Sequence, residues 1–323
     1  MKILIYSFND KIGDGLQKIT FIQELKKKYP DSSITYSTTR TSTLKNILNP
    51  LIKGMIDEFI EFNEIESSFI NLFREKHKFH KKKYDLIIDL QKVVLRTLNL
   101  KKISHIKFFS TSANFLFSDF KNYKNFEFKD IYIERFYFNI LSLITNEVYE
   151  EIPNIHIKNN PLIDTIIKTN INQNIAIAPG AGDILRQWNF NKYLEVAKKL
   201  RSEGFNVYFF LGPDERKYLD TCLKNNFPCP EWKDNEMITD DINFTFNLAK
   251  KMKCLLCNDG GTAWMFEFAG IKTLKIFGIT DEKKFARPGF SKTIKIQDYG
   301  FTEIKNFPLE NYTKILKDFL KDI

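Results

Sequence analysis

Short runs of apolar residues alternate with longer amphipathic stretches along the first half of this chain. Residues 3–8 form an apolar run that is typical of a β-strand, and the stretch from about 16 to 29 has the periodicity of a helix. Further strands are predicted at residues 33–39, 57–62 and 84–90. Strands separated by helical segments are typical of βαβ units, so the pattern predicts a parallel sheet covered by helices.

The same alternation restarts in the second half of the chain. Strands are predicted at residues 174–180, 206–212, 254–259 and 272–278, and helices at 191–204, 214–224, 262–270 and 308–320. A polar stretch with two prolines near residues 150–172 reads as a linker. The sequence therefore predicts two α/β domains, residues 1–155 and 156–323. Because open parallel sheets bind ligands at the carboxyl ends of their strands, we expect the two domains to face each other across a ligand-binding cleft.

Composition narrows the class of protein. The 323 residues are 43% apolar and 28% charged, which is typical of globular proteins. The net charge of +9 suits an anionic ligand or lipid, or simply solvated lysines such as those of the segment 74–83. Acidic residues interleave with the basic ones and no nucleic-acid-binding motif is present, so we expect no nucleic acid partner.

The first apolar run is too short for the core of a signal peptide, and no run approaches the ~20 residues of a membrane helix. We therefore expect a cytoplasmic protein, with peripheral contact to the inner face of the membrane as an extension of that expectation.

The cysteines do not favour a metal site. Cys254 and Cys257 form a C-x2-C pair inside an apolar strand, and Cys222 and Cys229 make a poor second pair. We expect four buried thiols and no bound metal.

The first chemical candidate follows the first strand, where Asp14 lies between Gly13 and Gly15. The glycines allow the backbone to bend sharply and to present the carboxylate at the end of the strand, where it could act as a general base. The alternative is that Asp14 caps the next helix, which the spacing alone favours. The G-D-G triplet lacks the pattern of a dinucleotide-binding loop.

The second candidate follows the first strand of the second half. Pro179 and Gly180 predict a tight turn, and the guanidinium of Arg186 can reach a phosphate or form a surface ion pair. We expect Trp188 to pack in the core rather than to stack on a base.

Two more strand-end loops carry polar groups. A strand-to-helix turn supplies a carboxylate, glycines and a hydroxyl at a helix N-terminus, which is either an anion site or an ordinary cap; its residues are Asp259, Gly260, Gly261 and Thr262. The next strand ends at Thr280 and Asp281, which cap a helix or bind ligand. Together the four loops predict a site for a phosphate-bearing ligand.

The order and spacing of these blocks resemble glycosyltransferase family nine, the lipopolysaccharide heptosyltransferases and their relatives. The resemblance covers most of the chain. It lies in the segments 12–35, 84–91, 212–216, 257–264 and 269–281. It implies a GT-B-like fold with two Rossmann-like domains, the first binding the acceptor and the second binding the nucleotide sugar.

The resemblance also implies an activity: inverting, metal-independent transfer of a heptose-like sugar from a nucleoside diphosphate, ADP-sugar favoured, to a glycan or lipopolysaccharide core acceptor, without another cofactor. Asp14 matches the proposed base and Arg186 the phosphate-binding cation. The donor-binding positions are Gly180, Glu215, Asp259, Gly260, Gly261, Thr262, Thr280 and Asp281, and Gly13 and Gly15 belong to an acceptor loop.

This sequence departs from the family at several positions, among them the first-domain motif, where the proline after Gly-Asp is missing. Trp264 replaces a histidine of the donor loop, Gly260 a serine or threonine, and Ile279 a proline. These departures leave two alternatives open, a degenerate binding protein and a sugar-nucleotide epimerase or hydrolase of the same fold.

Overall fold

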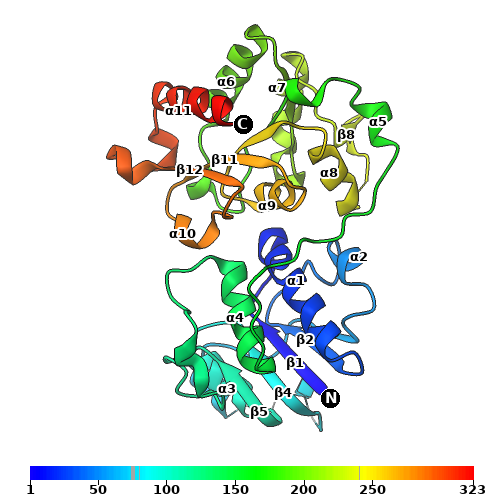
Figure 1. Ribbon diagram of the computed structural model, residues 1–323, viewed down its shortest axis with the longest axis vertical. Coiled ribbons are helices and arrows are strands. Elements are labelled where there is room, and N and C mark those ends of the chain that lie inside the picture. The colour runs from blue at the N-terminus through cyan, green and yellow to red at the C-terminus, as the bar shows by residue number, and fades with distance from the viewer. Residues whose placement is uncertain (74–76, 80, 240) are drawn as a thin grey trace. The chain divides into compact units, whose positions relative to one another are not determined.

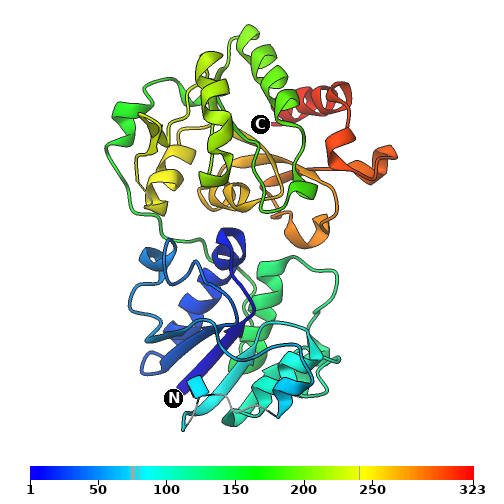
Figure 2. The ribbon, with the colours of Figure 1, turned by 180° about the vertical axis from the view of Figure 1, so that it is seen from behind.

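The computed structural model describes residues 1–73, 77–79, 81–239 and 241–323, so part of the lysine-rich segment 74–83 lies outside the described residues. The chain separates into two compact units, Met1–Ile155 and His156–Ile323. Each unit is a parallel sheet with helices on both of its faces (Figures 1 and 2). The predicted α/β class is therefore confirmed.

The N-terminal unit contains a five-stranded sheet in the order β3-β2-β1-β4-β5, with all neighbours parallel. Helices α1 and α4 pack together, and the ring centroids of Phe21 and Tyr137 lie 6.0 Å apart between them. Its elements are β1 (Lys2–Ser7), α1 (Ile12–Lys28), β2 (Ser33–Thr38), α2 (Asn49–Ile52), β3 (Glu58–Ile60), η1 (Ile70–Leu72), η2 (His77–Phe79), β4 (Lys83–Asp89), α3 (Val94–Lys101), β5 (Ser104–Ser110), η3 (Asn122–Asn125) and α4 (Ile133–Thr145).

The C-terminal unit contains a second parallel sheet, in the order β12-β11-β10-β6-β7, and a small antiparallel hairpin of β8 and β9. Its elements are α5 (Ile163–Ile166), η4 (Ile171–Gln173), β6 (Asn174–Ala178), η5 (Ile184–Arg186), α6 (Phe190–Ser202), β7 (Asn206–Phe209), η6 (Pro213–Tyr218), α7 (Leu219–Lys224), β8 (Trp232–Lys233), β9 (Glu236–Met237), α8 (Ile242–Ala249), β10 (Cys254–Asn258), α9 (Gly261–Phe268), β11 (Lys272–Phe277), α10 (Glu282–Phe285), β12 (Ser291–Lys295), η7 (Ile296–Tyr299), η8 (Ile304–Asn306) and α11 (Leu309–Asp322).

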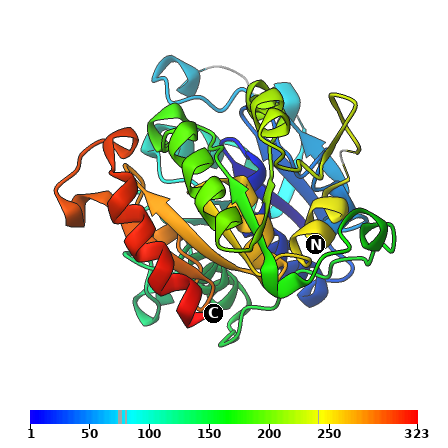
Figure 3. The ribbon, with the colours of Figure 1, turned by 90° about the horizontal axis from the view of Figure 1, so that it is seen from above.

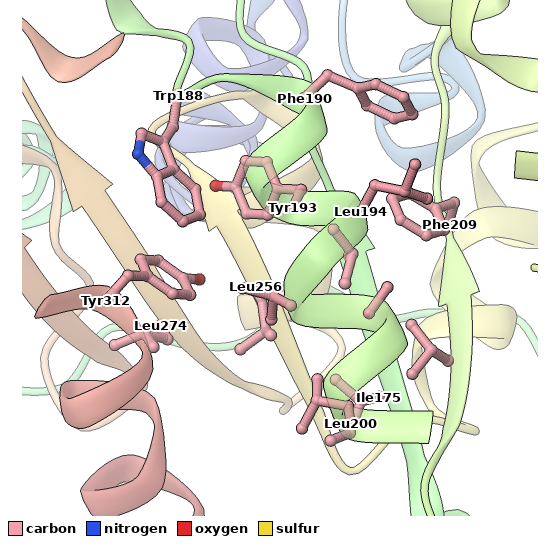
Figure 4. Close-up of a cluster of buried hydrophobic side chains, with 14 of the residues drawn as sticks. Ile175, Trp188, Phe190, Tyr193, Leu194, Leu200, Phe209, Leu256, Leu274 and Tyr312 are labelled. Carbon is pink, nitrogen blue, oxygen red and sulfur yellow. The ribbon is translucent and has the colours of Figure 1, made fainter. Parts of the chain in front are cut away.

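Alternation along the strands divides the core of the C-terminal unit into two layers. Ile175 and Ile177 point to the layer beneath α6 and α11, which lie side by side on one face of the sheet (Figure 3). Figure 4 shows this layer, in which the rings of Trp188, Tyr193 and Tyr312 gather. Ala176 and Ala178 point to the opposite layer, beneath α8 and α9. Period-two alternation buries both faces of each strand, as expected of a parallel sheet.

The same alternation explains the cysteine pair. Cys254 belongs to one layer and Cys257 to the other, so the two side chains point to opposite faces of β10 and cannot bind one ion together. All four thiols are free and buried. Burial raises the pKa of Cys254 to about 12, which keeps this thiol protonated.

Two sequence expectations need correction. The helix expected from about residue 16 begins at Ile12, so Gly13 and Gly15 lie inside α1 and do not form a sharp turn. A Cβ atom at Gly15 would lie 2.5 Å from a Leu48 methyl carbon, so this glycine lets α1 pack closely on its neighbour.

Among the described residues, no helix has both the length and the apolar composition that crossing a bilayer requires.

Candidate functional site

Each sheet has a point where neighbouring connections leave in opposite directions. In the C-terminal unit, β6 connects to β7 on one side, whereas β10 pairs with β6 on the other side. The carboxyl ends of β6 and β10 therefore meet at a topological switch point, where doubly wound sheets bind ligands. The segments that begin at Pro179 and Asp259, which the sequence analysis singled out, both leave from this point.

An ion pair joins these two loops. The Nη1 atom of Arg186 lies 3.6 Å from the Oδ2 atom of Asp259, and the Asp259 side chain is almost fully buried while that of Arg186 is 26% exposed. Asp183 accepts a hydrogen bond from the Leu185 N–H at 2.9 Å and so starts the short 3₁₀ turn that carries Arg186. Asp259 thus orients a partly exposed guanidinium, which keeps donors free for a phosphate.

The side chain of Asn258 fixes the backbone of both loops. Its oxygen accepts hydrogen bonds from the Trp188 N–H at 3.0 Å and the Tyr193 hydroxyl at 3.2 Å. Its amide donates to the Pro179 carbonyl at 2.6 Å. The Trp188 ring is buried, stacks on Tyr312 and donates to the Phe307 carbonyl at 2.8 Å. Trp188 therefore packs in the core, as expected.

Two glycines bring the backbone close to the carboxyl group of Glu215, and a third glycine packs against the first of them. A Cβ atom at Gly180 would lie 2.4 Å from the Cδ atom of Glu215, and one at Gly212 would lie 2.8 Å from its Oε2 atom. One at Gly260 would lie 3.2 Å from the Gly180 carbonyl oxygen. The structure thus brings Gly180, Glu215 and Gly260 together. Burial, followed by the charge of Asp214, raises the pKa of Glu215.

Helix α9 begins directly after Asp259. Gly260 is its N-cap and Gly261 its first residue, and the half-buried Thr262 follows. The first N–H groups of a helix lack partners within it and carry the positive end of the helix dipole, so this turn suits an anion. Trp264 lies one turn further on and is 2% exposed, with the Lys275 ammonium 5.0 Å from its ring centroid.

The last predicted pair lies on the loop after β11. Asp281 is exposed and accepts a hydrogen bond from the Lys283 N–H at 3.1 Å, so it caps the short helix α10. The Thr280 hydroxyl is enclosed and has no hydrogen-bond partner among the described residues. This loop approaches the Arg186 turn, since a Cβ atom at Gly278 would lie 3.6 Å from the Leu185 carbonyl oxygen. Among the described residues, no hydrogen bond or ion pair joins Thr280 or Asp281 to Asp259.

In the N-terminal unit, Asp14 occupies the first turn of α1. Its side chain is exposed, and its carboxylate accepts a hydrogen bond from the Lys11 N–H at 3.4 Å. Lys11 rather than Asp14 is the N-cap residue, so Asp14 supports the start of the helix from within its first turn, and its exposed carboxylate remains accessible to a substrate. The sheet of this unit has its own switch point between β1 and β4, and the Asp14 turn follows β1.

Comparisons with known proteins place the chain in a family. A model of glycosyltransferase family 9 (heptosyltransferase) matches residues 72–314. The chain belongs to this family. It is accordingly a glycosyltransferase, and membership does not favour the degenerate or epimerase alternatives. No curated protein sequence matches the chain.

Solved structures of known proteins share the fold of this chain. A glycosyl transferase family 9 protein from Veillonella parvula superimposes with a TM-score of 0.65 at 16% identity, covering 100% of this chain and 97% of that one. E. coli ADP-heptose LPS heptosyltransferase II gives 0.62 at 15% identity, covering 100% and 99%. E. coli heptosyltransferase WaaC with ADP-2-deoxy-2-fluoro heptose gives 0.60 at 12%, covering 98% and 99%. The predicted GT-B-like fold is therefore confirmed.

The N-terminal unit of this glycosyltransferase also contains a buried ion pair that the sequence analysis missed. The Asp10 carboxylate contacts the Lys18 ammonium, and both side chains are almost fully buried. It also accepts hydrogen bonds from the hydroxyls of Ser7 at 2.8 Å, Tyr36 at 2.8 Å and Ser42 at 3.0 Å. Burial alone would raise the pKa of Asp10, but the Lys18 charge and these hydrogen bonds outweigh it and lower the pKa.

A signal for this pair exists in the sequence. Lys18 lies four residues after Asp14, among positions of α1 that the helical pattern assigns to the buried face. A lysine at such a position requires a carboxylate partner, since an unpaired buried charge is strongly unfavourable. The first acidic residue after strand β1 is Asp10, which is the partner that the structure shows.

Asp89 is a second buried carboxyl group of this glycosyltransferase that was not predicted. It ends β4 and accepts hydrogen bonds from the hydroxyls of Thr97 at 2.7 Å and Ser110 at 2.9 Å, and from the Gln91 amide at 3.0 Å. Burial raises its pKa to about 6, although these hydrogen bonds act in the opposite direction. Through these hydrogen bonds, the Asp89 carboxyl group holds the turn after β4 in place at the switch point of the sheet.

Proposed function

We propose that this family-9 member is an inverting, metal-independent glycosyltransferase that moves a heptose-like sugar from an ADP-sugar to a glycan of the cell envelope. The observation that carries the proposal is the arrangement at the β6/β10 switch point. A partly exposed Arg186, the start of α9 and a half-buried Glu215 converge there on glycine-lined backbone. Such a site suits a nucleoside diphosphate.

The donor is assigned by the chemistry of each group. The two phosphates would meet the N–H groups at the start of α9, the Thr262 hydroxyl and the Arg186 guanidinium. Asp259 would orient Arg186 rather than touch phosphate, because two anions repel. By the same reasoning, the Glu215 carboxyl group would bind hydroxyls of the ribose. Structural relatives whose names include ADP-heptose or ADP support an ADP-sugar as the donor.

The reaction would be a single in-line displacement. The acceptor hydroxyl attacks the anomeric carbon, the bond from this carbon to the diphosphate oxygen breaks, and ADP leaves. Asp14 takes the proton of the attacking hydroxyl, which its exposed position permits. Arg186 and the α9 turn neutralise the charge that develops on the leaving phosphate, and each such donor is worth about 3 kcal/mol in comparable sites. One displacement inverts the anomeric configuration.

The acceptor and the location complete the proposal. The acceptor is a glycan or glycolipid of the lipopolysaccharide core type, bound by the N-terminal unit. We place the reaction in the cytoplasm, at the inner face of the membrane.

Two measurements test the donor site. ADP, GDP, UDP and CDP are compared by thermal unfolding; a nucleotide present at 100 times its dissociation constant stabilises the protein by about 2.7 kcal/mol. We expect the largest shift with ADP. Arg186→Ala should lose most of the shift, whereas Arg201→Ala, which removes an arginine at the far end of α6, should keep it. Equal shifts for all four nucleotides, or an unchanged shift in Arg186→Ala, would contradict the assignment.

The chemistry is tested with ADP-heptose and a lipopolysaccharide core acceptor. We expect ADP release that depends on the acceptor and persists in EDTA, with an inverted anomeric centre in the product by NMR. Asp14→Asn should reduce kcat by at least about 100-fold while it leaves ADP binding unchanged. ADP release without acceptor would indicate hydrolysis instead, and normal turnover of Asp14→Asn would remove the assigned base.

A further inference from the structure

One turn of the N-terminal unit presents apolar side chains to solvent. Phe69, Ile70 and Phe73, in and beside η1, are 66%, 65% and 80% exposed. The rings of Phe69 and Phe73 contact each other edge to face, with centroids 6.1 Å apart. Three large apolar side chains within five residues form a cluster, unlike the isolated exposed residues that are common on protein surfaces. We call these three residues the aromatic turn.

The backbone of the aromatic turn is held while its side chains project. The Asn99 amide of α3 donates to the Glu66 carbonyl at 3.1 Å, which anchors the chain just before the turn. The Lys102 ammonium, at the end of α3, donates to the Leu72 carbonyl. It also lies 5.5 Å from the centroid of the Phe73 ring. The turn is therefore a supported projection of apolar side chains.

Besides Lys102, which contacts this turn, Lys78 follows it closely along the chain and Lys83 lies near Lys102 in the sheet. Lys78 donates to the carbonyls of Glu61 at 2.7 Å and Phe62 at 2.8 Å, beside another exposed aromatic ring. Lys83 pairs in the sheet with Ser104, two residues after Lys102. The nearby acids have their own cationic partners, in the pairs Lys82–Glu58, Lys45–Glu61 and Arg40–Glu66. Within the described chain, no carboxylate forms an ion pair with Lys78, Lys83 or Lys102.

We propose that the aromatic turn, together with Lys78, Lys83 and Lys102, forms a docking surface for an anionic lipid bilayer. Phenyl rings and an isoleucine side chain enter the boundary between headgroups and acyl chains, while the three lysines attract anionic headgroups. The charge of these lysines selects this partner over a second copy of the chain, whose identical lysines would repel. Such docking would keep the N-terminal unit beside a lipid-linked acceptor.

Vesicle binding tests the surface without any substrate, so its outcome is independent of the proposed transfer reaction. The full chain is centrifuged with vesicles of phosphatidylcholine alone or with about one third phosphatidylglycerol. We expect binding only to the anionic vesicles, and release at about 0.5 M salt. The double variant Phe69→Ser/Phe73→Ser should bind at least about tenfold more weakly. Val148→Ser, which removes an equally exposed apolar side chain of the same unit, should bind normally.

A second variant reports the depth of contact. The three native tryptophans lie in the C-terminal unit, at positions 188, 232 and 264. The variant Phe73→Trp adds one at the aromatic turn, and its added fluorescence should shift to the blue and be quenched by brominated lipid. Absence of binding to anionic vesicles would overturn the proposal, as would equal binding by Phe69→Ser/Phe73→Ser. Size-exclusion chromatography showing a dimer that this variant dissolves, without vesicle binding, would identify a second copy as the occupant instead.

Discussion

Gly180→Ala offers the sharpest test of how the nucleotide site is built. The new Cβ atom would lie 2.4 to 2.8 Å from the three atoms of the Glu215 carboxyl group, whereas ordinary contacts lie at 3.4 to 4 Å. The carboxyl group must therefore retreat by roughly 1 Å. Because it is the far end of a flexible side chain and Gly180 has no positive φ, we expect little change in the free energy of unfolding.

The nucleotide should respond much more strongly than the fold. A hydrogen bond between a charged group and its partner contributes about 1.5–3 kcal/mol, so its loss should weaken ADP binding by about 10- to 150-fold. Isothermal titration calorimetry with ADP measures this loss. Gly212→Ala, whose Cβ atom would meet only one carboxyl oxygen at 2.8 Å, should cause a smaller loss.

A double-mutant cycle decides whether Gly180 acts through Glu215. Glu215→Ala alone should weaken ADP binding to a similar extent. In the Glu215→Ala background, Gly180→Ala should weaken ADP binding by less than about threefold further, because the new Cβ atom meets no carboxyl group. Additive losses in the double variant would refute the reasoning, as would unchanged ADP affinity in Gly180→Ala.

Three further predictions concern buried polar groups. Asp10→Asn leaves the buried Lys18 charge without its partner and should lower the free energy of unfolding by about 3–5 kcal/mol in urea denaturation. Adding Lys18→Met should restore most of this stability. A double variant as unstable as Asp10→Asn would contradict the reasoning. Asp89 binds a proton in the folded state between its ordinary pKa of 3.8 and about 6. Stability should therefore fall by up to about 3 kcal/mol as pH rises through that window, and Asp89→Asn should flatten the profile; an identical slope in that variant would exclude Asp89 as the cause. Asn258→Asp keeps the shape of the side chain but loses its donation to the Pro179 carbonyl, so urea denaturation should show a loss of about 1–3 kcal/mol, and full stability would argue against the bridge.

The sequence predicts the order of elements well because the alternation of apolar runs and turn residues is local. It places the loops after β6 and β10 correctly, and the spacing around Asp259 predicts a helix start. It fails where side chains far apart in sequence decide the structure. The apposition of Glu215 to Gly180 and the Asp10–Lys18 pair depend on the tertiary arrangement. Glycine signals either a turn or close packing, so the sequence alone does not reveal that Gly15 serves packing; the nearby Leu48 decides this.

The bridge made by Asn258 also limits how this scaffold can be re-engineered. One amide group ties the Pro179 carbonyl and the Trp188 N–H to the end of β10. A chimera that imports the loop after β6 from another transferase, without its counterpart after β10, would leave a donor or an acceptor unmatched inside the protein. The loops after β6 and β10 should therefore be exchanged together when donor specificity is transferred from another transferase.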